Sequence, residues 1–148
     1  MDWTPAFYAL GVLSGLAVSA SAGPLDGRDI ATGKRLYGET CASCHGAQLE
    51  GQPNWREPGA DGILPAPPHN ESGHTWHHDT GLLFDYVKRG GAAALADRGV
   101  GDFASGMPGF AETLEDSEIL DILAFIRSTW SDRMQAVQAE RDERRSEH

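Results

Sequence analysis

The chain has 148 residues, with 12 basic and 22 acidic side chains, and its formal net charge is −10 at pH 7. This length suits one domain built around one core. The acidic balance argues against a nucleic-acid partner, because phosphates would repel the chain, and it favours protein partners that present a basic docking patch.

Residues 1–22 have the composition of an export signal. An apolar run from Ala6 to Val18 leads to Ala20 and Ala22, which match a cleavage site between small residues. The start of the chain has an acid, Asp2, and no basic residue, so retention as a membrane anchor is the alternative. A spanning helix needs about 20 apolar residues, and polar residues, Gly and Pro interrupt this run. We predict a cleaved signal peptide and a periplasmic domain over 23–130, tethered only if 1–22 is retained.

A first helix is predicted from about Asp29 to Cys41. Its apolar residues recur at the helical interval, and Asp26 or Asp29 can cap its N-terminus. Gly33 inside this helix costs about 1 kcal/mol relative to alanine, which a closely crossing helix would explain. The helix delivers a pair of cysteines at its C-terminal end.

Cys41-Ala42-Ser43-Cys44-His45 has the pattern of a site for covalent attachment of haem c. Each thiol can form a thioether with a haem vinyl group, and the imidazole of His45 can bind the iron from one face. A structural zinc site normally needs four Cys or His ligands, and a thioredoxin-like dithiol needs a strand-rich setting. The chain has two cysteines and no strand-like runs near the motif. We therefore predict one haem c, bound through Cys41 and Cys44.

Residues 46–76 are rich in Gly, Pro, Asn and His and predict a long loop. A structureless stretch of this length needs something to wrap, and a haem meets that need. Four histidines lie near Trp76 in this part of the chain: His69, His74, His77 and His78. The spacing of the last three could bind a metal such as copper, or one histidine could bind the iron. The simpler interpretation is hydrogen bonding to haem propionates or to the loop backbone.

A helix is predicted from Asp79 or Thr80 to the glycines at positions 90 and 91. The loop 99–109 follows, and Met107 lies there among glycines and proline rather than in an apolar stripe. A thioether opposite an imidazole favours ferrous iron and raises the reduction potential, as suits an electron carrier. We therefore expect Met107, rather than a histidine, to be the second axial ligand.

The strongest helical pattern of the chain comes last. The segment Thr-Leu-Glu-Asp at 113–116 has the form of a capping box, and apolar residues from Ile119 to Trp130 recur at the helical interval. Residues 131–148 are mostly charged. We predict a solvated helical extension or a frayed tail there, rather than a helix that packs on the domain.

Together these features resemble the class I cytochrome c family over about Ile30 to Trp130. The resemblance implies an all-α fold, with three to four helices wrapped around one covalently bound haem c. It implies that the first and last helices cross at Gly33, Tyr37 and Phe125, and that His45 and Met107 hold the iron.

The resemblance also bears on the haem pocket. In the family, a proline carbonyl holds the second nitrogen of the ligand histidine. Pro67 is the candidate for that role here, with Pro65 and Pro58 as alternatives, and Trp76 is a further candidate for the pocket.

The function implied is that of a monomeric mono-haem carrier that passes single electrons between redox proteins and is not an enzyme. With both axial positions filled, no site is open for oxygen or peroxide chemistry, and no Ser/His/Asp or paired-carboxylate arrangement stands out. Two alternatives stay open. One is a cytochrome subunit of a larger oxidoreductase. The other is a metal-handling or sensory haem protein that uses the histidine-rich loop.

Overall fold

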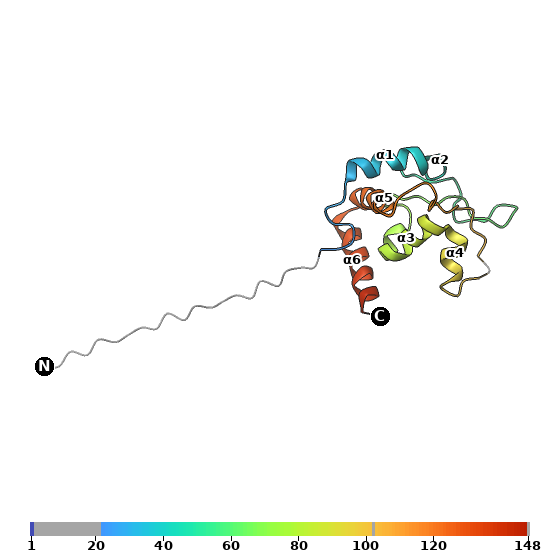
Figure 1. The fold of residues 1–148 in the computed structure, drawn as a ribbon. Helices are drawn as coiled ribbons and strands as arrows, with labels where there is room; N and C mark the ends of the chain where they lie inside the picture. The colour runs from blue at the N-terminus through green and yellow to red at the C-terminus, as the bar shows by residue number, and fades with distance from the viewer. Residues whose placement is uncertain (2–21, 102, 148) are drawn as a thin grey trace.

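The computed structural model describes residue 1 and residues 22–101 and 103–147, and these ranges contain helices and no strands (Figure 1). The helices are α1 (Ile30–Thr40), α2 (Ala42–His45), the short 3-10 helix η1 (Thr75–His77), α3 (Thr80–Arg89), α4 (Gly91–Ala96), α5 (Asp116–Ser128) and α6 (Asp132–Ser146). The predicted all-α fold is confirmed. The body of the predicted signal peptide, residues 2–21, lies outside the described residues. Within the described ranges, no helix is both long and apolar enough to cross a membrane.

The core is centred on the crossing of α1 and α5, which lie against each other in Figure 1. A side chain at Gly33 would put its Cβ 2.5 Å from the carbonyl carbon of Asp121 and 3.0 Å from the Cβ of Phe125. Glycine therefore allows the two backbones to touch. Beside this point, the rings of Tyr37 and Phe125 pack edge to face with their centroids 5.6 Å apart. The crossing that the resemblance predicted is confirmed.

Two helix starts follow the predicted caps. The carboxylate of Asp29 accepts the N–H of Thr32 at 3.0 Å and begins α1, and the carboxylate of Asp79 accepts the N–H of Leu82 at 2.9 Å and begins α3. Each cap satisfies one of the free N–H groups of a first helical turn. The predicted bounds of these two helices are confirmed.

The start of α5 differs from the prediction. Glu115 is its N-cap, and the backbone N–H of Glu115 donates to the carboxylate of Glu118 at 2.9 Å. The hydroxyl and the N–H of Thr113 donate instead to the carbonyl of Phe110, at 3.2 and 3.0 Å. The capping box predicted at Thr113 is therefore wrong, because Thr113 closes a turn just before the helix.

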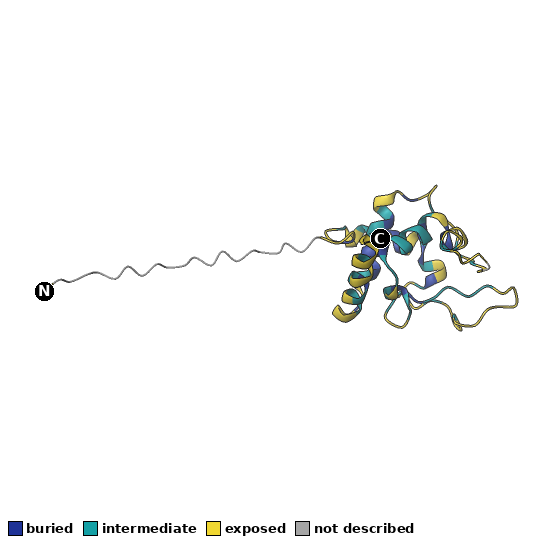
Figure 2. Cartoon of the chain, turned by 90° about the horizontal axis from the view of Figure 1, so that it is seen from below, coloured by how far each residue is buried: buried dark blue, intermediate teal, exposed yellow. Residues whose placement is uncertain are grey.

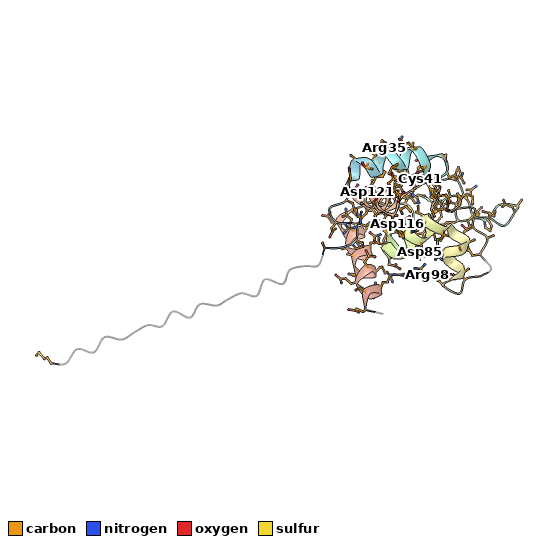
Figure 3. The ribbon with its side chains drawn as sticks, in the orientation of Figure 1. Arg35, Cys41, Asp85, Arg98, Asp116 and Asp121 are labelled. Carbon is orange, nitrogen blue, oxygen red and sulfur yellow. The ribbon has the colours of Figure 1, made fainter. Side chains whose placement is uncertain are left out.

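Helix α4 was not predicted. It begins at Gly91, one of the two glycines that were expected to end the preceding helix. Gly90 has φ of +83°, which turns the chain, and the alanines after it are strong helix formers. Arg98, just beyond α4, pairs with Asp85 of α3 at 3.7 Å (Figure 3).

The C-terminal helix α6 packs on η1 and α3. Its Gln138 is only 1% exposed. The carboxylate of Asp142 accepts the N–H of Thr80 at 2.5 Å and the Thr80 hydroxyl at 2.8 Å, which covers the start of α3. The predicted helical extension is confirmed, but the expectation that it does not pack on the domain is wrong. The charged composition hid the docking, which uses the carboxylate of Asp142 and the partly buried Met134.

Figure 2 shows the buried residues gathered in the centre of the molecule, with the long loop projecting to one side. Residues 56–62, in the middle of that loop, are exposed. The loop returns at Pro67 to the region of the cysteines. Its two ends, rather than its tip, therefore carry the candidate site.

Candidate haem site

The two cysteines lie where α1 passes into α2. Cys41, labelled in Figure 3, ends α1 and is 7% exposed, whereas Cys44 lies in α2 and is exposed. Both are free thiols, and burial raises the pKa of the Cys41 thiol. The Cys41 thiol is thus inside the protein and the Cys44 thiol is at its surface. This arrangement suits a haem that is attached through both thiols and only partly enclosed.

His45 ends α2 and is 6% exposed. The carbonyl oxygen of Pro67 lies 2.9 Å from its Nδ1, and because a carbonyl can only accept, Nδ1 donates this hydrogen bond. The other ring nitrogen, Nε2, is left without the proton and can bind a metal. Burial also lowers the pKa of His45, which keeps the ring neutral. Of the three candidate prolines, Pro67 makes the predicted contact.

The backbone around His45 is also held. The N–H of Gly51 donates to the carbonyl of His45 at 2.7 Å, and the hydroxyl of Tyr37 donates to the carbonyl of Gly46 at 3.2 Å. These bonds join the start of the loop to α1. His45 is therefore fixed at its ring and at its main chain.

The ring of His69 contacts His45, whereas the rings of the other three histidines contact tryptophans or one another. The His69 ring stacks on the His45 ring with centroids 3.9 Å apart and an angle of 18° between the planes. Burial lowers the pKa of His69 well below its ordinary value. His69 therefore covers the face of the His45 ring and lies on the same side of the site as His45.

The remaining histidines contact tryptophans and one another. His74 stacks on Trp55 with centroids 5.2 Å apart, the His78 ring meets His74 edge-on at 5.3 Å, and His77 meets Trp76 at 3.7 Å. In the described part of the chain, no three His, Cys, Asp or Glu side chains come together as a metal site. The spacing that suggested copper does not produce a three-ligand site.

Several buried polar atoms of the loop fit a haem. Trp76 Nε1 and His74 Nδ1 are buried, with no hydrogen-bond partner among the described residues. Buried donors of this kind almost always have an acceptor in a complete site. The carboxylates of a haem could fill that role. The two thiols, the free Nε2 of His45 and these donors together form a set that suits haem c.

Met107 lies in a loop that is held by the first residue of α4 and by the C-terminal end of α3. The N–H of Gly91 donates to the Met107 carbonyl at 3.1 Å, and the N–H of Phe110 donates to the carbonyl of Val87 at 3.0 Å. The N–H of Met107 donates to the hydroxyl of Ser105 at 3.2 Å. Met107 is partly buried, packs on the core cluster that includes Cys41, and lies near His45. Sequence analysis found this methionine but missed that the end of α3 anchors its loop.

The chain was compared with known proteins. A family model described as "Cytochrome c" matches residues 30–130, well over half of the chain. A search of curated proteins and a search of solved structures found no match. The match contains the cysteine motif, the long loop, Met107 and the crossing of α1 and α5. The chain therefore belongs to the cytochrome c family, whose members carry a covalently attached haem c and transfer electrons.

Proposed function

We propose that this protein is a mono-haem electron carrier in which His45 and Met107 hold the iron from opposite faces, while Cys41 and Cys44 fix the haem through thioethers. The observation that carries the proposal is the hydrogen bond from His45 Nδ1 to Pro67. It assigns the proton to one ring nitrogen and leaves the other for the iron. When bound, the haem supplies a one-electron couple.

The chain's own residues have three tasks in this proposal. The Pro67 carbonyl orients His45 and makes its imidazole a stronger donor, which favours ferric iron. The thioether of Met107 favours ferrous iron, so the two ligands act in opposite directions on the reduction potential. The buried indole N–H of Trp76 would donate to a propionate.

Turnover needs two protein partners and no substrate. A reduced partner would supply one electron to the bound haem, and an oxidised partner would later take it. The net charge of −10 favours partners with a basic docking patch. We infer an exported, periplasmic monomer that does not itself transform a small molecule.

The ligand set is tested by the absorption of the oxidised holoprotein in the near infrared, where a sulfur-to-iron charge-transfer band reports a methionine ligand. We expect this band in the wild type and its loss in Met107→Ala. Met134→Ala is the matched control, because Met134 lies in α6 and should leave the band unchanged. Absence of the band from the wild type, or its survival in Met107→Ala, would contradict the ligand assignment.

A further inference from the structure

The face of the His45 ring is covered by a second imidazole. We propose that His69 is a positioning residue that holds the plane of the His45 imidazole, and that its polar ring, lying beside His45, tunes the potential of the iron. The contact that carries the proposal is the stacking of the two rings, with centroids 3.9 Å apart and planes 18° from parallel. The proposal rests on the proposed function, because it takes His45 as the iron ligand.

A single hydrogen bond does not fix a ring completely. The bond from His45 Nδ1 to Pro67 sets the direction of one N–H, but the ring can still tilt about that direction. A flat group in contact with the face limits this tilt. The hydrogen bond to Pro67 at the edge of the His45 ring and the stacking of His69 on its face together define the plane of that ring.

His69 can act in this way because it is itself firmly held. Its N–H donates to the carbonyl of Leu49 at 2.9 Å, and its carbonyl accepts the indole N–H of Trp130 at 2.7 Å. The ring of Tyr37 lies edge-on to the His69 ring at 5.8 Å. The support thus reaches His45 from Tyr37 of α1, from the loop and from Trp130, two residues beyond the end of α5.

The expected effect on the iron has two parts. The plane of an axial imidazole determines how unpaired spin is distributed over the ferric haem, so a change of plane alters the spread of the haem methyl signals. A polar ring beside the ligand also stabilises the more positive ferric state better than an aliphatic side chain does. Loss of the His69 ring should therefore raise the reduction potential.

The experiment uses the oxidised holoprotein with three substitutions. His69→Leu removes the flat ring, His69→Phe keeps a flat ring, and His78→Leu changes a histidine that meets His74 edge-on instead. Proton NMR of the haem methyl groups reports the ligand plane, and spectroelectrochemistry reports the potential. We expect a changed methyl pattern in His69→Leu only. We also expect the reduction equilibrium constant of His69→Leu to rise about threefold, or about 28 mV at 59 mV per tenfold.

The controls separate this inference from the proposed function. A wild type that lacks a low-spin His/Met spectrum overturns the proposed function itself. A normal wild type, with His69→Leu indistinguishable from it in methyl pattern and potential, overturns only the role of His69. If His69→Leu does not take up haem, His69→Asn also lacks a ring, and the same two measurements on it decide.

Discussion

At the scale of single residues, the support of His45 depends on a glycine. Gly51 has φ of +69°, and a Cβ placed there would lie 2.7 Å from the carbonyl carbon of Pro67. The same residue donates its N–H to the His45 carbonyl. Gly51 therefore allows the two ends of the long loop to come together beside His45.

Gly51→Ala should push the Pro67 carbonyl away from His45. We expect a raised reduction potential, because His45 becomes a weaker donor, and a loss of about 2 kcal/mol in the free energy of unfolding. Gly27→Ala is the control, since Gly27 has φ of +72° but no described atom within 4 Å of a Cβ. That variant should lose about 1 kcal/mol from backbone strain and keep its potential. Equal potentials in the two variants would contradict this account.

At the scale of helices, the contact between α1 and α5 can be tested with two glycines of the same helix. Gly33→Ala places a methyl group against the backbone of Asp121 and should cost about 3 kcal/mol, because two packed helices must separate. Gly38→Ala points to a place with no described atom within 4 Å and should add about 0.5–1 kcal/mol of stability. Denaturant unfolding of both variants measures the difference. Similar losses in the two would show that the crossing is not tight.

The helices also show which parts of the fold could be predicted. Helices α1 and α3 were predictable because caps and apolar spacing are local signals. Helix α4 was missed because it is short and starts at a glycine that signals a loop. The docking of α6 was missed because Asp142 contacts the domain through its carboxylate, and apolar periodicity does not report such a contact.

The residues of the candidate site also fall into those that could be predicted from the sequence and those that could not. The attachment motif and Met107 could be found because their chemistry is written in a few neighbouring residues. Pro67 came from the family resemblance, with two other prolines still open. The position of His69 could not be predicted, because the spacing of histidines along a loop does not say which of them folds back onto His45.

At the scale of the whole molecule, two half-buried histidines, His74 and His78, should make stability depend on pH. Burial is the main cause that lowers the pKa of His74, with His77 and Arg56 adding to it. Burial likewise lowers the pKa of His78; His74, His77 and Arg141 act in the same direction, while Asp79 opposes them. An unfolded histidine has a pKa of about 6.5, so below that pH the unfolded chain binds more protons than the folded one. Stability should then fall as the pH is lowered.

Denaturant unfolding of the holoprotein at pH 7.5 and 5.5 measures this effect. We expect a lower free energy of unfolding at pH 5.5, by less than about 1 kcal/mol per histidine because water screens both side chains. The double substitution His74→Gln and His78→Gln should flatten the profile. An unchanged slope in that variant would show that other groups cause the dependence.

The docking of α6 means that residues beyond the family match support the domain that the match covers. The family match stops at residue 130, yet Asp142 covers the first turn of α3, and the last turn of α3 anchors the loop of Met107. Helix α6 thus contacts one end of α3, and the loop of Met107 contacts the other. A fragment that ends at residue 130 would keep every candidate ligand but lose α6. Helix α3, whose last turn anchors the loop of Met107, would then lack the contact of Asp142 with its first turn.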